Sequence, residues 1–250
     1  MFEDMSLILI VSGIYLLAGA IKGLLGLGLP TTAITFMTFV MSPLQAIAVN
    51  LLPMFLTNVW QFSRAENRRL LVKHYRYFAT SLCISIFCFS FFTGRLSPTA
   101  LQLLVAFAVM LFSIYNLRQK AISLASNKDM LWQILFGCAA GFMGAFTSMW
   151  AVPMVIYLLS RNLSPKEFVD AAGFLLLIGC LPLSVGYIAT GVVTSDIWVP
   201  AIAATISAWC GFQLGEYLRL YVNASLFRRL LLWFFFIMGV RMALVAIEAL

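Results

Sequence analysis

The feature that most constrains this chain is a series of apolar runs that recur, with few charges, from Leu7 to Val245. Of its 250 residues, 63% are hydrophobic and only 10% are charged, whereas a soluble domain is about half apolar and about a quarter charged. Long, continuous apolar runs predict helices that cross a membrane. A membrane β-barrel would instead show side chains that alternate in polarity. We therefore expect an all-α, polytopic membrane helical bundle.

Ten apolar segments can be delimited, and some of them are only half as long as a membrane span. They are 5–22, 30–41, 44–63, 71–93, 98–118, 130–146, 149–160, 165–190, 196–219 and 224–249. Acidic residues and no basic n-region precede the first segment, which favours a retained span over a signal peptide. We predict one integral membrane domain made of a first repeat (1–118), a linker (119–129) and a second repeat (130–250).

Two sequence signals recur in the same order in each half of the chain. A glycine triplet spaced G-x-x-x-G-x-x-G occurs at Gly19, Gly23 and Gly26, and again 118 residues later at Gly137, Gly141 and Gly144. Each triplet leads into a short apolar run that ends at SPLQ or SPKE, where Ser caps a new helix, Pro begins it and Gln or Glu closes a capping box. Because each unit has five segments, the second must enter the membrane from the opposite side. The pattern predicts a 5+5 inverted repeat.

Basic residues are unevenly distributed between the loops. If the N-terminus is outside and each segment crosses in turn, nearly all of the 16 Lys and Arg residues lie in the inside loops, and only Arg95 and Arg241 are on the outer side. An excess of Lys and Arg marks the cytoplasmic side of a membrane protein. We therefore predict that both termini are outside and that the linker 119–129 is cytoplasmic. This explanation of the net charge of +7 requires no nucleic acid.

Two segments, 30–41 and 149–160, are too short to cross a membrane. Their 12 residues form about 18 Å of helix, against a hydrocarbon core of about 30 Å. Glycines and Pro30 mark the start of the first, and the polar Thr147 and Ser148 precede the second, which favours a break in the chain over a continuous helix. A helix that begins inside the bilayer exposes N–H groups that lipid cannot satisfy but a small anion can. We therefore predict an anion site between two half-helices.

Eleven residues are candidates to bind the anion. They are Lys22, Gly26, Leu27, Gly28, Thr31, Thr32, Asn50, Gly144, Thr147, Ser148 and Trp150. Glycine allows close approach of the backbone, hydroxyls donate hydrogen bonds, a deeply placed Lys22 adds positive charge, and Trp150 offers an apolar wall. Other roles stay open, because G-x-x-x-G also packs membrane helices, Lys22 can snorkel to the surface, and Asn50 or Asn58 can bond to a neighbouring helix.

The stretches GLLGLGLP with SPLQAIAVN, and GFMGAFTSMWAVP with SPKEFVDAAG, resemble the TauE/SafE sulfite-exporter family of membrane permeases over nearly the whole chain. The resemblance implies transport of sulfite, sulfonates or related small organic anions. We expect the protein in a bacterial inner membrane, where the charge distribution places both termini outside, in the periplasm. Leu27 and Leu29 interrupt the longer glycine run of the family, and Asn50 and Leu51 replace a common Thr-Ser pair. These departures leave the substrate open.

We predict a secondary transporter for a small anion, sulfite or an organosulfonate, that works by alternating access between two inverted halves. An anion channel and a non-transporting membrane subunit are the alternatives. A membrane-embedded enzyme is the weakest one, because the chain has a single histidine, His74, scattered cysteines and no known catalytic motif. The expected partners are the anion and the lipid bilayer, with no catalytic residue, cofactor or metal; a homodimer, the direction of transport and the coupling ion stay open.

Overall fold

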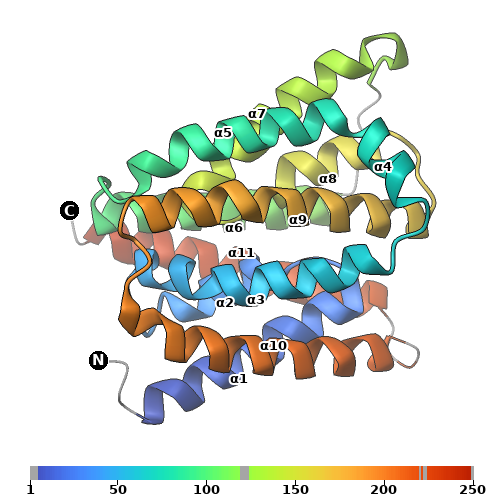
Figure 1. Cartoon of the computed structure of the whole chain (residues 1–250). Coiled ribbons are helices and arrows are strands. Elements are labelled where there is room, and N and C mark those ends of the chain that lie inside the picture. The colour runs from blue at the N-terminus through green and yellow to red at the C-terminus, as the bar shows by residue number, and fades with distance from the viewer. Residues whose placement is uncertain (1–4, 119–123, 220, 222–223, 249–250) are drawn as a thin grey trace.

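The computed structural model describes residues 5–118, 124–219, 221 and 224–248, and in these residues it contains helices and no strand (Figure 1). The elements in chain order are α1 (Met5–Leu25), α2 (Leu29–Met37), α3 (Pro43–Ser63), α4 (Arg68–His74), α5 (Arg76–Thr93), α6 (Pro98–Arg118), the short η1 (Ser126–Lys128), α7 (Asp129–Thr147), α8 (Ala151–Leu159), α9 (Pro165–Ala189), the short η2 (Ser195–Ile197), α10 (Trp198–Leu218) and α11 (Ala224–Glu248). The all-helical prediction is confirmed.

Most predicted segments match one helix to within a few residues, but the prediction of a single segment over 71–93 was wrong. The chain turns there at Tyr75, whose φ of −96° and ψ of 17° are not helical, so that α4 and α5 are separate helices. Tyr75 is buried, and its ring lies edge-on to that of Tyr157 with 6.2 Å between centroids. The corner is therefore held by tertiary packing, which an apolar run in the sequence does not reveal.

Seven helices in the described part of the chain are long and apolar enough to cross a membrane. They are α1, α5, α6, α7, α9, α10 with η2, and α11. The central helix α3 has 21 residues but carries four amide side chains, which lower its hydropathy. Its position beside α9 and α10 makes it part of the same bundle (Figure 1).

Two long helix pairs form the flanks of the bundle: α1 packs along α10, and α7 packs along α5. A Cβ atom added to Gly19 would lie 2.1 Å from the Ala208 carbonyl oxygen, and one added to Gly211 would lie 2.0 Å from the Leu16 oxygen. In the second pair, a Cβ on Gly137 would lie 2.0 Å from Ser81 Oγ. These glycines let neighbouring helices approach, as small residues do in membrane bundles.

The helices α3 and α9 begin at the predicted capping boxes. The Gln45 amide N–H donates to Ser42 Oγ over 3.4 Å, and the Glu167 amide N–H donates to Ser164 Oγ over 3.3 Å. Each Gln or Glu side chain accepts a bond from the serine amide in return. The two boxes are 122 residues apart and start two helices that contact each other at the centre of the bundle.

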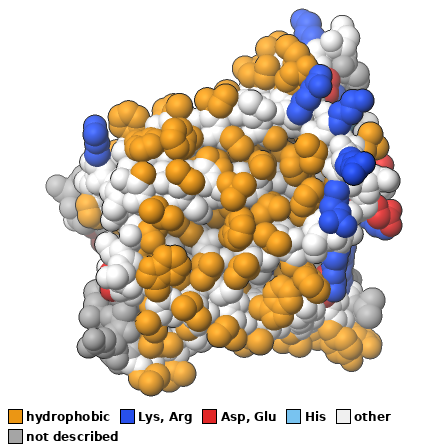
Figure 2. Space-filling model, in the orientation of Figure 1, with side chains coloured by type: hydrophobic (Ala, Val, Ile, Leu, Met, Phe, Trp, Pro, Cys, Tyr) orange, Lys and Arg blue, Asp and Glu red, His pale blue; other side chains and the backbone are white. Residues whose placement is uncertain are grey.

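The end of the bundle at which α3 ends, α4 lies and α9 begins is called the basic end here, and Figure 2 shows Lys and Arg side chains gathered along it beside a broad apolar surface. α1 begins and α11 ends at the opposite end (Figure 1). Three ion pairs link loops and helices of the basic end. They join Arg64 to Glu216 over 2.9 Å, Arg161 to Asp129 over 3.2 Å, and Lys166 to Glu66.

Replacing Gly19 by Ala tests the close contact between α1 and α10. The new methyl group would overlap the Ala208 backbone, and overpacking of about 1–3 kcal/mol should lower the melting temperature of the purified protein by roughly 2–10 °C. Gly13→Ala is the matched control on the same helix, because a Cβ there meets nothing within 4 Å. Equal melting temperatures for the two variants would contradict the packing argument.

Candidate functional site

The chain breaks at both predicted places. α1 ends at Leu25 and α2 begins at Leu29, while α7 ends at Thr147 and α8 begins at Ala151. With nine residues each, α2 and α8 are about 14 Å long, which is less than half of a membrane core.

The helices before the two breaks end in the same way. The Gly26 amide donates to the Lys22 oxygen over 2.7 Å, and the Ser148 amide donates to the Gly144 oxygen over 2.8 Å. Both donors are left-handed, with φ of 78° at Gly26 and 57° at Ser148. Gly28, with φ of 104°, directly precedes α2, whereas Trp150, with φ of −104°, directly precedes α8. A left-handed residue ends a helix by turning the chain away from its axis, which is why each half-helix starts inside the bundle.

Neither half-helix has a side-chain cap at its start, in contrast to α3 and α9. The first turns of both helices line one small central cavity, through Leu29, Pro30 and Thr31 of α2 and through Ala151 of α8. Its volume of about 10 Å³ is close to the room that one water molecule needs. Two positive helix ends therefore meet at one enclosed point, which is the arrangement that binds anions.

Lys22 brings its amino group to the same point. It is only 2% exposed, so it is buried in the bundle and does not snorkel to the surface. Its Nζ donates to Thr57 Oγ1 over 3.1 Å and to Asn58 Oδ1. In the described part of the chain no carboxylate forms an ion pair with it. A buried ammonium without a counter-charge is costly, and a bound anion would supply that charge.

Six of the eleven candidate residues line the central cavity. They are Lys22, Leu27, Gly28, Thr31, Ser148 and Trp150. Trp150 is 1% exposed, and its Nε1 donates to the Leu175 oxygen over 3.3 Å, which fixes the ring as a wall. Added Cβ atoms on Gly144 and Gly179 would each lie 2.9 Å from that ring, so these glycines make room for it.

The other five candidates do not line the cavity, and four of them shape the breaks. Gly26 carries the left-handed turn, Gly144 lies under Trp150, Thr32 Oγ1 donates to the Gly28 oxygen over 2.9 Å, and Thr147 Oγ1 donates to the Met143 oxygen over 2.7 Å. Asn50 accepts a bond from the Tyr15 hydroxyl over 3.3 Å, which joins α3 to α1.

Two polar residues of α3 were not among the eleven. Thr57 and Asn58 hold the Lys22 ammonium, and Asn58 Nδ2 also lies 3.5 Å from Cys180 Sγ of α9. The sequence could have indicated these two residues, because a buried lysine needs oxygen acceptors and Asn58 is an amide in an apolar helix. The rest of the cavity wall comes from Met149 and Leu176.

Comparison with known proteins gives one match. The family model described as "Sulfite exporter TauE/SafE" matches residues 11–242, which is nearly the whole chain. Neither a curated protein nor a solved structure matches the chain significantly. The matched region contains both breaks, both capping boxes and Lys22. The chain belongs to the TauE/SafE sulfite exporter family of membrane proteins.

Proposed function

We propose that this protein is a secondary transporter that carries a small anion, sulfite or an organosulfonate, by alternating access around the central cavity. Membership of a sulfite exporter family gives the class of protein. The observation that carries the proposal is the meeting of Lys22 with the uncapped starts of α2 and α8. The Lys22 amino group and two positive helix ends converge there, and no carboxylate of the described residues lines the cavity.

The arrangement of the helices supports an inverted repeat of 1–118 and 130–250, joined by the linker 119–129, whose residues 119–123 lie outside the described part. Exchange of the halves maps the pair α1 and α10 onto the pair α7 and α5, and maps α3 onto α9. Asn58 and Cys180, each 15 residues after the first proline of its helix, touch at the centre. Equivalent positions that touch lie on the axis relating two halves, as in transporters with inverted repeats.

The size of the central cavity favours a carrier over an open channel. Room for about one water molecule leaves no continuous path for an ion in this conformation. A substrate as large as an organosulfonate would enter only after the helices around the breaks had moved apart. Alternating access supplies such a movement, since the two halves can rock against each other around the site.

The surface charge supports an orientation with the basic end in the cytoplasm. Both termini would then lie in the periplasm of a bacterium whose inner membrane holds the bundle. The apolar surface between the two ends of the bundle fits the lipid core (Figure 2).

The first test of the anion site is Lys22→Gln. Without the ammonium, saturable flux of radiolabelled sulfite into liposomes should fall by about 100-fold or more, since a lost buried charge pair costs roughly 3–5 kcal/mol. Lys73→Gln is the control, because Lys73 is an exposed residue of α4. If Lys22→Gln transports sulfite at the wild-type rate, the proposal that the anion binds at Lys22 is wrong.

The second test concerns the break before α2. Gly28→Leu and Gly26→Leu should abolish flux while the protein still inserts, because a side chain is strained at φ of 104° or 78°. Gly13→Leu is the control, since its position on α1 has ordinary φ and open space. Normal transport by both Gly26→Leu and Gly28→Leu would separate the glycines from the site.

The orientation can be tested by labelling. In a chain whose five cysteines are replaced by Ala, Lys73→Cys and Arg95→Cys place one thiol at each end of the bundle, and both original side chains are exposed. A membrane-impermeant maleimide added to intact cells should modify Arg95→Cys alone. Modification of Lys73→Cys alone would show the reverse orientation.

A further inference from the structure

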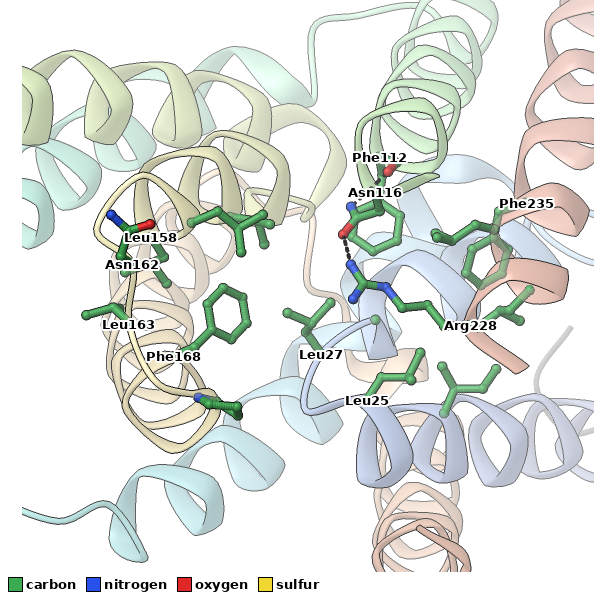
Figure 3. A pocket seen from close by; sticks show the side chains of 17 residues that line it. Leu25, Leu27, Phe112, Asn116, Leu158, Asn162, Leu163, Phe168, Arg228 and Phe235 are labelled. Atoms are coloured by element: carbon green, nitrogen blue, oxygen red, sulfur yellow. Dashed lines mark hydrogen bonds between the residues drawn. The ribbon is translucent and has the colours of Figure 1, made fainter. Parts of the chain in front are cut away.

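A second and larger cavity lies beside the central one, toward the basic end. Its volume is about 430 Å³, and its walls come from α1, α6, α8, α9 and α11 (Figure 3). It reaches the surface at the exposed residues Asn162 and Pro165. Leu27 and Gly28 line both cavities, so the loop between α1 and α2 is the partition between them. We call this second space the outer cavity.

The outer cavity is mostly apolar but contains one cationic side chain. Its apolar walls include Phe112, Leu158, Phe168, Leu231 and Phe235. The cation is Arg228, whose Nη2 donates to Asn116 Oδ1 over 2.9 Å (Figure 3). Asn116 is 2% exposed, and its Nδ2 donates to the Phe112 oxygen over 2.8 Å, which turns its own oxygen toward the guanidinium.

Arg228 is a partly buried cation that forms no ion pair with a described carboxylate. Arg64, Arg161 and Lys166 each form an ion pair, whereas Arg228 forms none with the described residues. It also lies early in α11, near the positive end of the helix dipole, and the first turn of α11 contains no acidic residue. A cation at that position is unfavourable unless an anion joins it. The local charge therefore favours a negatively charged occupant.

The shape and chemistry of the outer cavity define that occupant further. A guanidinium can chelate an oxyanion with two N–H groups while another stays on Asn116. The apolar walls can contact a short hydrocarbon chain, which needs no hydrogen bonds. They offer few hydrogen-bond donors to replace the water molecules around an inorganic ion. The volume of about 430 Å³ is within the range of small-molecule pockets.

We propose that Arg228, positioned by Asn116, forms an outer binding subsite for small organic oxyanions, sulfonates or carboxylates with a short apolar part, which are held there before they pass Leu27 to the central site. The proposal rests on the proposed transport function for the direction of passage, but binding at Arg228 can be measured without transport. Leu27 separates the subsite from Lys22. The anion would therefore contact Arg228 first and Lys22 afterwards.

The test is calorimetric titration of the purified full chain with 1-propanesulfonate and, separately, with sulfate. Arg228→Gln should weaken propanesulfonate binding by about tenfold or more, as expected for loss of a charge-assisted bidentate contact. The adjacent and exposed Arg229 provides the matched control, and Arg229→Gln should change the affinity by less than about twofold. Sulfate should bind the wild-type chain at least about tenfold more weakly than propanesulfonate, because it buries no hydrocarbon.

If Arg228→Gln does not yield folded protein, Leu163→Trp decides the question. This change fills the outer cavity from its partly buried rim and leaves Arg228 in place, so it should also weaken propanesulfonate binding by about tenfold or more. Unchanged affinity in both folded variants, or in Leu163→Trp alone when it is the only one to fold, would overturn the proposal.

Lys22→Gln separates this inference from the proposed function. The variant should lose flux but keep propanesulfonate affinity within about threefold, because Lys22 does not line the outer cavity. Loss of binding in Lys22→Gln together with normal binding in Arg228→Gln would place the ligand in the central cavity and end the proposal of an outer subsite. If the wild-type chain binds propanesulfonate through Arg228 but shows no flux of any anion tested, the subsite is upheld and the proposed transport function is refuted.

Discussion

The starts of α2 and α8, which no side chain caps, are the constraint on which the rest of this structure depends. A membrane offers no hydrogen-bond partner to a backbone N–H, and neither helix has a side-chain cap. Such helix ends are tolerable only if they are enclosed in protein. The central pair α3 and α9 lies beside them, and the flanking pairs α1 with α10 and α5 with α7 close the bundle. The positive potential of the two ends is thereby concentrated in a cavity instead of being dissipated in solvent.

The glycines of this chain serve two different physical requirements that the same sequence motif does not distinguish. Gly19 and Gly137 let helix backbones approach so closely that a methyl group would overlap the neighbouring helix. Gly26 and Gly28 adopt positive φ and end one helix before the next begins. Gly19 and Gly137 allow the helices around the site to pack closely. Gly26 and Gly28 create the helix ends that this packing encloses. Close packing and the break in the chain therefore depend on each other, and the first triplet contains a glycine of each kind, Gly19 and Gly26.

Features encoded by neighbouring residues could be predicted from the sequence, and features made by distant residues could not. The capping boxes and both breaks depend on a few adjacent residues, and they occur where the sequence indicates. The bond between Lys22 and Asn58 spans 36 positions, and the corner at Tyr75 depends on packing against Tyr157, so neither has a local signal. The glycine triplets recur after 118 residues but the capping boxes after 122. The two spacings differ by about one helical turn. A glycine moved by one turn stays on the same face of its helix, so it can still pack against the neighbouring helix.

The register of 122 residues also explains why the two halves contribute different side chains to the site. It pairs Lys22 with Gly144 and Gly28 with Trp150, so one half supplies the charge and the other supplies the aromatic wall. If the halves are related as proposed, Asn58 and Cys180 lie on the axis between them, and the ammonium bound to Asn58 is close to that axis. A second lysine at position 144 would place two cations together without a carboxylate, at a cost that low local polarity increases. One lysine near the axis can face an anion from either half, and Gly144 leaves the space that Trp150 occupies.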